Sequence, residues 1–402
     1  MNRVVITGIG VISPVGCTLA EFWSALVDAR SGIRPIQGIP TERLSTACAA
    51  QALSFDAQAR LGPRRANAID RFAQFAVCAA RDAVVDAGLH IDEELALEVA
   101  TIIGTGIGGQ TSLDAAYLKL YGENSPFVHP LTVPRLMANA APSHVSIDLG
   151  LKGAAYSVST ACASGTHAVG QAFHLIRSGA ARIAIAGGTE ACISVGGIKA
   201  WEALHVLSND TCRPFSKTRS GLVLGEGAAV LVLEARDHAM ARGASIYAEV
   251  RGFGMSADAV DMVSPDIDGA VRAMQAALRD ASCNADEIDY VNAHGTGTTL
   301  NDKAETSALR CVFGAHAGNL AVSSNKGVLA HSLGAAGALE AAATALTLRH
   351  QIVPPTANYQ EPDPECDLDV VPNIARSMPL RTAMSNSFAF GSLNAVLVLG
   401  RA

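Results

Sequence analysis

The chain has 402 residues, of which 49% are hydrophobic and 17% are charged. This length and composition predict a large buried core, organised as two domains or as one fused pair. The formal net charge of −7 arises from 30 basic and 37 acidic residues with no run of either sign, which argues against a nucleic-acid-binding surface. No uninterrupted apolar stretch reaches the roughly 18 residues of a membrane span, so none is expected.

The nine cysteines are odd in number and contain no Cys-x-x-Cys spacing. Neither a zinc site nor a disulfide framework is therefore expected, and most of the cysteines fit a reduced core in the cytoplasm. The N-terminal stretch MNRVVITGIGVISPVGC imitates a signal peptide ending at a lipid-modified Cys17. Its β-branched residues and glycines favour a strand followed by a turn, and Pro14 does not suit a cleavage site. The sequence thus predicts a cytoplasmic protein.

Short β-branched runs alternate with alanine-rich helical stretches along the whole chain, which is typical of an α/β protein with largely buried strands. The expected strands are residues 3–10, 100–106, 156–160, 182–188, 228–234, 247–255, 290–295, 320–325 and 394–400. The expected helices are residues 67–88, 163–178, 267–281, 302–313 and 333–350. RVVITGIG and YAEVRGFG open two similar parts, so a boundary is expected near residue 245, without a flexible linker.

A glycine-rich motif follows one of the predicted strands. Gly104, Gly106 and Gly109 follow a predicted strand in the GxGxxG pattern of dinucleotide-binding proteins. No second strand ends in an acidic residue about 20 positions further on, where the ribose contact is expected. Structural glycines in a tight loop are the preferred interpretation.

A cysteine stands where a predicted strand meets a predicted helix, in the stretch SVSTACASG (157–165). The unpaired N–H groups and the positive dipole of a helix N-terminus lower a thiol's pKa. Small neighbouring residues would give a substrate access to Cys162. From this stretch alone, a nucleophile and a buried structural cysteine remain equally open.

Two further stretches favour a nucleophile. NAHGTGT ends a predicted strand on His294 and continues into a polar loop, and SSNKGVLAHSLGAAGALE ends another on Lys326 and carries His331. Histidines on glycine-flanked loops after strands are more often functional than histidines on a helix face. Cys162 and the two histidines would supply a nucleophile and two groups that bind or transfer protons.

The order and spacing of these motifs resemble the β-ketoacyl synthases, the condensing enzymes of fatty-acid and polyketide assembly. The resemblance covers essentially the whole chain, from VVITGIGVISPVG through TACASG, RPFSKTRSGLVLGEGA and NAHGTGT to SNSFAFGSLN. Its Cys-His-His set is that of the elongating class. The resemblance implies a thiolase-like α/β fold of five layers, αβαβα, built from two similar halves. Residues 1–245 would carry the nucleophilic cysteine, and residues 246–402 would carry both histidines.

The resemblance also implies roles. Cys162 would hold an acyl group as a thioester. His294 and His331 would bind the malonyl thioester oxygen and stabilise the enolate formed on decarboxylation. Lys326, paired with Glu340, would set the electrostatics of the site. The backbone N–H groups of Cys162 and Phe390 would form the oxyanion hole.

Further positions match family residues with a binding role. The pantetheine contacts would be Thr296 and Thr298; the acyl pocket would be lined by Ile107, Gly197 and Trp201; a structural monovalent cation would be bound by Asn292, Glu305, Glu340 and Ser385. The resemblance implies no redox or nucleotide cofactor and no catalytic metal. It implies acyl carrier protein as the partner, and a homodimer or a heterodimer with a related ketosynthase.

The sequence departs from the family pattern at several places. Ala389 and Ser392 replace glycines in the loop that gates the acyl pocket, Ala330 replaces the glycine before His331, and Trp201 stands where phenylalanine is common. Ser216 and Ser220 occupy positions that are usually aspartate in housekeeping enzymes. These departures put the housekeeping substrate range in doubt, so two alternatives stay open: housekeeping fatty-acid elongation and a specialised pathway, such as aryl polyene, polyketide or nodulation-factor lipid synthesis. Two other hypotheses stay open: a catalytically silent chain-length factor and a dinucleotide-dependent oxidoreductase.

Overall fold

Ten strands form one mixed sheet in the computed structural model, which describes residues 1–402. Their order across the sheet is β10-β9-β13-β14-β8-β1-β7-β6-β4-β5. The strands are β1 (Val4–Ile12), β4 (Val99–Gly104), β5 (Ala155–Val158), β6 (Ile183–Glu190), β7 (Gly227–Ala235), β8 (Ala248–Ala257), β9 (Tyr290–Asn292), β10 (Ala321–Ser323), β13 (Thr382–Ala389) and β14 (Leu393–Arg401). Two short ribbons pair β2 (Arg34–Pro35) with β3 (Cys48–Ala49), and β11 (Ile352–Val353) with β12 (Arg376–Ser377).

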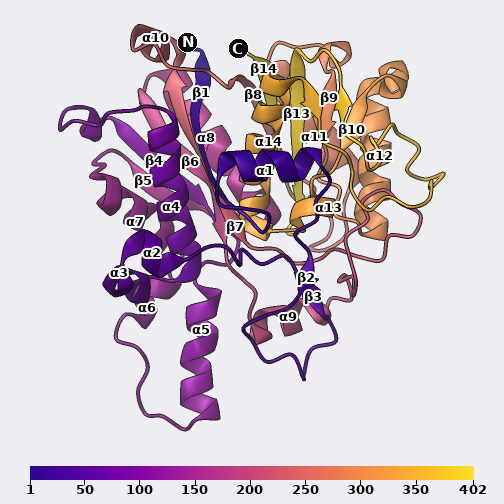
Figure 1. Cartoon of the computed structure of the whole chain (residues 1–402). Coiled ribbons are helices and arrows are strands. Elements are labelled where there is room, and N and C mark those ends of the chain that lie inside the picture. The colour runs from indigo at the N-terminus through magenta and orange to yellow at the C-terminus, as the bar shows by residue number, and fades with distance from the viewer.

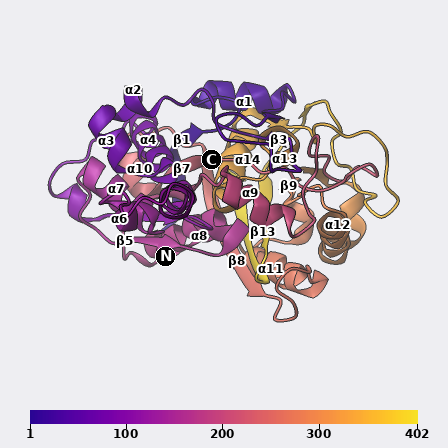
Figure 2. The same cartoon turned by 90° about the horizontal axis from the view of Figure 1, so that it is seen from below.

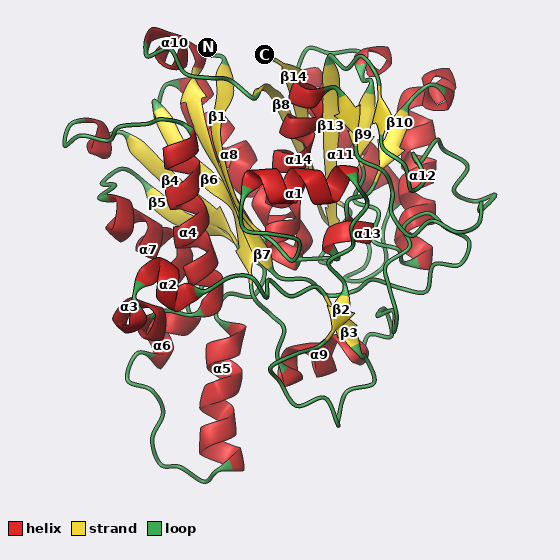
Figure 3. Cartoon of the chain, viewed as in Figure 1, coloured by secondary structure: helices red, strands yellow, loops and turns green.

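Fourteen α-helices surround and separate these strands (Figure 3). They are α1 (Leu19–Val27), α2 (Ala57–Leu61), α3 (Pro63–Ala68), α4 (Arg71–Asp86), α5 (Gln110–Tyr117), α6 (Thr132–Leu136), α7 (Ala140–Leu149), α8 (Ser164–Ser178), α9 (Val195–Glu202), α10 (Arg236–Ala241), α11 (Ile267–Asp280), α12 (Thr299–Phe313), α13 (Lys326–Leu329) and α14 (Ala336–His350). No helix combines the length and the apolar character needed to cross a membrane.

The two halves of the sheet repeat one pairing pattern. From β1 outwards through β7, β6, β4 and β5, two antiparallel pairings are followed by two parallel ones. From β8 outwards through β14, β13, β9 and β10 the same succession recurs. A short antiparallel pairing of β1 with β8 joins the halves, which lie side by side in Figures 1 and 2.

The helices complete five layers (Figure 1). α4 packs on the outer face of β1 and β7, and α11 on the outer face of β8 and β14. Between the half-sheets lie α8 and α14, each contacting strands of both halves. Every residue of α14 from Ala336 to Leu348 is buried, as expected for a helix that is apolar on all sides and enclosed by protein. The predicted α/β class and thiolase-like fold are confirmed.

Each predicted strand is present with bounds within two residues, except that 290–295 shortens to β9, and the N-terminal stretch that imitates a signal peptide forms the central strand β1. β13 was missed because its sequence, TAMSNSFA, mixes polar and small residues although all but its last residue are buried. The division of the chain at residue 245 stays a prediction, since a continuous sheet crosses it.

Candidate active site

A pocket of about 240 Å³ opens near the carboxyl ends of the parallel strands, where open α/β sheets place their ligand sites. The loops after β5, β9 and β10, and the turn between β13 and β14, supply its chemistry. Eight predicted site residues line it together: Cys162, Trp201, His294, Thr296, Thr298, Glu305, His331 and Phe390. Residues separated by more than 200 positions in the sequence thus meet in one cavity.

Cys162 lies on a tight turn. Ala161 adopts a left-handed conformation with φ of 46°, and a 3₁₀ turn over Ala161–Ala163 leads into α8 at Ser164. The backbone N–H groups of Phe390 and of Cys162 itself lie close enough to the sulfur to lower the pKa of the thiol. These are the two groups expected to form an oxyanion hole.

The structure corrects the expected effect of the helix on the thiol. Burial raises the pKa of Cys162 to about 11, and the Lys326 ammonium and the two N–H groups offset this only in part. The sulfur lies among apolar side chains, including Ile193, Leu222 and Leu333, which cannot solvate a thiolate. Cys162 therefore rests as a neutral thiol.

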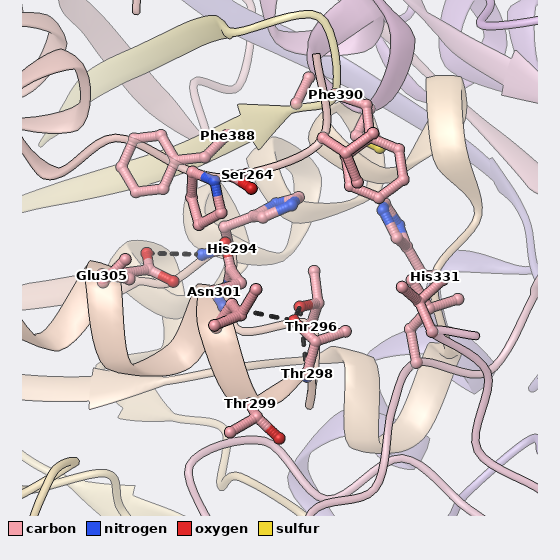
Figure 4. A pocket seen from close by; sticks show the side chains of 18 of the residues that line it. Ser264, His294, Thr296, Thr298, Thr299, Asn301, Glu305, His331, Phe388 and Phe390 are labelled. Carbon is pink, nitrogen blue, oxygen red and sulfur yellow. Dashed lines mark hydrogen bonds between the residues drawn. The ribbon is translucent and has the colours of Figure 1, made fainter. Parts of the chain in front are cut away.

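The loop that carries His294 is held by a buried carboxylate. Glu305, on α12, accepts hydrogen bonds from the backbone N–H groups of His294 at 2.8 Å and Gly295 at 2.7 Å (Figure 4). β9 ends at Asn292, three residues before the end of the predicted strand 290–295, so His294 belongs to this loop rather than to the strand. Thr298 caps α12 and pairs with Thr296 through their hydroxyls, 2.9 Å apart.

Lys326 sets the protonation pattern of His294. Its ammonium forms a buried ion pair with Glu340 and donates to the carbonyl oxygen of His294 at 2.6 Å. The same Nζ lies 3.4 Å from Nδ1 of His294. Because an ammonium can only donate, Nδ1 is the acceptor and the ring proton resides on Nε2. Lys326 is the first residue of α13, not the last of β10 as predicted.

Both histidines are neutral in this environment. Their ring centroids lie 5.4 Å apart in a T-shaped arrangement, and both rings point into the pocket near Phe390 (Figure 4). Burial, followed by the nearby Lys326 cation, lowers the pKa of each well below 6.5. At neutral pH each imidazole can donate a hydrogen bond to an oxygen that develops negative charge.

The turn between β13 and β14 forms one wall. Phe390 stacks on Trp201, with ring centroids 5.7 Å apart and planes inclined by 21°. Ser392 stands at φ of 63°, and its hydroxyl donates to the carbonyl oxygen of Asp261. Ala330, before His331, also has a positive φ, of 56°. Both departures from glycine thus fall where an L-residue is strained.

Two predicted pocket residues are not brought to this cavity. Ile107 is 44% exposed on the loop after β4. Gly197 is buried in α9, where its N–H donates to Ser194 and its Cα faces the carbonyl oxygen of Cys192. Sequence reasoning also missed the loop Asp258–Asp266, which lines the pocket with Met262, Val263 and Ser264. Its sequence, DAVDMVSPD, carries no motif, so only the fold reveals it.

The residues assigned to a structural cation fit an oxygen-ligated ion. Asn292 and Ser385 are partners in the register of β9 and β13, and their buried side-chain polar atoms have no hydrogen-bond partner. One oxygen of Glu340 is also unpartnered. Burial raises the pKa values of Glu305 and Glu340 to about 7. Repulsion between negative charges adds to both shifts: Asp302 acts on Glu305, and Glu305 acts on Glu340. A monovalent cation would relieve this repulsion.

A thiol that can hold an acyl group beside two neutral hydrogen-bond donors suits carbon–carbon bond formation through an enolate. On this duplicated α/β frame, it places the protein among the thiolase-like condensing enzymes. More narrowly, the chain belongs to the β-ketoacyl synthase family: residues 1–239 match the N-terminal domain of β-ketoacyl synthases and residues 247–360 the C-terminal domain. It is an acyltransferase.

Known proteins of this family align over nearly the whole chain. Nodulation protein E of Rhizobium sp. (strain N33) is 45% identical over 396 residues, 98% of each chain. The 3-oxoacyl-[acyl-carrier-protein] synthase 2 of Synechocystis sp. is 42% identical over 404 residues, covering 98% of this chain and 97% of that protein. A type II polyketide ketosynthase, solved in complex with its acyl carrier protein, superposes with a TM-score of 0.91 at 33% identity, over 100% of this chain and 99% of that one.

Proposed function

We propose that the protein elongates an acyl chain held on Cys162 by decarboxylative condensation with malonyl-carrier protein, yielding a 3-oxoacyl-carrier protein. One observation carries this assignment. Cys162, His294, His331 and Phe390 line one pocket, and the backbone N–H groups of Cys162 and Phe390 lower the pKa of the Cys162 thiol.

In the first half-reaction, the sulfur of Cys162 attacks the carbonyl carbon of the incoming acyl thioester. The tetrahedral oxyanion is bound by the two N–H groups, each of which contributes a factor of about 10²–10³ in such sites. The bond to the carrier's sulfur breaks, and the proton of Cys162 passes to the departing thiol, with neutral His331 beside the reaction as a proton acceptor. The acyl group remains on the enzyme.

In the second half-reaction, malonyl-carrier protein loses carbon dioxide and the electron pair enters its thioester carbonyl as an enolate. The Nε2–H of His294 and the imidazole of His331 donate to that oxygen. The enolate carbon attacks the acyl carbonyl on Cys162, a carbon–carbon bond forms, and the carbon–sulfur bond breaks. Cys162 leaves as a thiolate and is reprotonated. Lys326 keeps Nδ1 of His294 free of a proton throughout.

The substrates would arrive on the phosphopantetheine arm of acyl carrier protein, with Thr296 and Thr298 at the entrance of the pocket. The carrier complex of the related polyketide ketosynthase supports this partner. We further propose a homodimer in the cytoplasm, without a redox or nucleotide cofactor. The outer edge of β5 is free, and its Tyr156 is exposed, which leaves this edge open to pair with a second copy.

The substrate range is proposed to be specialised. The Trp201–Phe390 stack narrows the pocket beside Cys162, and the chain is as similar to nodulation protein E as to a fatty-acid synthase. A flat indole in the wall favours short or planar unsaturated acyl groups over long saturated ones.

Intact-mass analysis tests this proposal. The purified protein is offered acyl-carrier proteins of increasing length and unsaturation, then malonyl-carrier protein. Wild type should gain the mass of one acyl group and release 3-oxoacyl-carrier protein, and Cys162→Ala should gain none. A folded wild type that is never acylated by any carrier would instead indicate a silent chain-length factor.

A further inference from the structure

Glu190, the last residue of β6, is a fully buried carboxylate that no predicted role includes. One of its oxygens accepts the N–H of Gly106 at 2.6 Å and the N–H of Gly334 at 3.0 Å. The other accepts the hydroxyl of Thr105 at 3.0 Å and the N–H of Ile107 at 3.3 Å. Four hydrogen-bond donors and no cation surround this carboxylate. Burial of such a group costs free energy unless its hydrogen bonds are made, as they are here.

The carboxylate lies where two backbones nearly touch. A Cβ on Gly334 would lie 2.2 Å from the nitrogen of Gly106 and 2.7 Å from Glu190, and a Cβ on Gly106 would lie 2.8 Å from the same carboxylate. Only glycine fits at either position. This close approach explains Gly106 of the GxGxxG stretch, and similar approaches to the backbones of Ser164 and Arg135 explain Gly104 and Gly109, without a dinucleotide.

One of the two backbones supports the nucleophile. The hydroxyl of Ser164 shares its single proton between the carbonyl oxygens of Ala161, at 2.7 Å, and Thr105, at 3.3 Å. It also accepts the N–H of Thr160 at 2.8 Å. The turn bearing Cys162 is thereby fastened to the loop that Glu190 holds.

The other backbone supports a histidine. Gly334 belongs to the 3₁₀ turn Leu333–Ala335, which follows His331 and leads into α14. The charge of Glu190 also acts on the nucleophile, since it raises the pKa of the Cys162 thiol. Glu190 is thus hydrogen-bonded both to the loop that supports Cys162 and to the turn that follows His331.

We propose that Glu190 is a positioning residue of the condensing site: its carboxylate ties the turn that follows His331 to the loop that supports Cys162, and so keeps imidazole and thiol in register. This role rests on the proposed function and adds a residue from β6 to it. Glu190 touches no reacting atom and acts through the two loops.

The test compares Glu190→Gln with wild type in two assays. The first is the pH dependence of alkylation of Cys162 by iodoacetamide, read on the Cys162 peptide by mass spectrometry. The second is carbon dioxide release from malonyl-carrier protein. In the variant an amide NH₂ must face N–H donors, so we expect decarboxylation to fall at least tenfold, towards the roughly hundredfold cost of a 1 Å misplacement. Removing the negative charge should move the alkylation midpoint to lower pH.

Glu234→Gln is the matched control. Glu234 is equally buried on β7 and is hydrogen-bonded by Thr7, His238 and Arg242, outside the pocket. Its variant should lose stability and keep both readouts.

Unchanged readouts in Glu190→Gln, or equal changes in Glu234→Gln, would overturn the role of Glu190. If Glu190→Gln does not fold, Glu190→Asp keeps the charge with a shorter reach, and must lower decarboxylation without moving the alkylation midpoint. A wild type that fails to decarboxylate would refute the proposed function instead, while the alkylation profile would still report on Glu190.

Discussion

At the scale of single residues, the site depends on burial more than on charge. Burial keeps Cys162 protonated and both histidines neutral. A neutral imidazole carries one ring N–H, so it can donate a hydrogen bond to a forming enolate oxygen without first changing its protonation state. The same burial shields an acyl-cysteine from water. The charged groups buried with the site are compensated: Lys326 pairs with Glu340, and Glu305 and Glu190 accept hydrogen bonds from backbone N–H groups.

The lowered pKa values of His294 and His331 predict that neither histidine titrates during decarboxylation near neutral pH. A histidine with its pKa held well below 6.5 stays neutral as the pH falls through 6.5 and becomes protonated only at more acidic pH. Any change in carbon dioxide release from malonyl-carrier protein between pH 6 and 8 should therefore come from Glu305 and Glu340, whose pKa values burial raises to about 7, and not from the imidazoles. His294→Ala should be inactive throughout this range. A wild-type profile that falls with a midpoint near 6.5 would show that the imidazoles titrate normally.

At the scale of elements, the sequence predicted the parts that repeat and missed the parts that depend on long-range packing. β-branched runs revealed the strands because strands buried on both faces are apolar throughout. The motifs around Cys162, His294 and His331 were visible because each follows a predicted strand. The raised pKa of Cys162 was not, since it arises from burial in a cluster that includes Leu222 and Leu333, which are distant in sequence. A lone acid closing the apolar strand RIAIAGGTE was the available signal for Glu190.

Ser392 links two elements that enclose the pocket. Its carbonyl oxygen accepts the N–H of Asp258 at 2.9 Å, its hydroxyl donates to Asp261, and the neighbouring Gly391 donates to Met262 at 2.8 Å. Ser392→Ala should remove the hydroxyl bond at a cost of about 1 kcal/mol and keep the strained φ. Hydrogen exchange in residues 258–264, measured by mass spectrometry, should become faster.

Ser392→Gly separates the hydrogen bond from the backbone strain. It removes the same hydroxyl but relieves a left-handed conformation that costs an L-residue roughly 1–2 kcal/mol. Exchange in residues 258–264 should rise as in the alanine variant, whereas the melting temperature should stay closer to wild type. Equal melting temperatures for the two variants would mean that φ at residue 392 stores no strain, and unchanged exchange would mean that the hydroxyl does not hold the loops together.

At the scale of the whole molecule, the central layer unites the two halves. The largest core cluster contains 45 buried residues drawn from both sides of residue 245. α8 comes from the first half and contacts β8 and β14 of the second; α14 comes from the second half and contacts β6 and β7 of the first. The outer core under α4, of 27 residues, belongs to the first half, and the one under α11, of 24 residues, belongs to the second half except for Phe215. The proposed reaction depends on this arrangement, because Cys162 lies just before the N-terminus of α8 and His331 lies a few residues before that of α14.

This shared core predicts cooperative unfolding. Calorimetry of the full chain should show one transition, because either half alone would expose the face of its sheet that α8 and α14 now cover. Gly165→Ala tests the central contact: a Cβ there would lie 2.8 Å from the nitrogen of Ala338, on α14. It should move the whole transition to lower temperature. Gly318→Ala, where a Cβ meets nothing within 4 Å, should leave it in place. A scan that resolves into two transitions, with only one displaced by Gly165→Ala, would show instead that residues 1–245 and 246–402 unfold as separate domains.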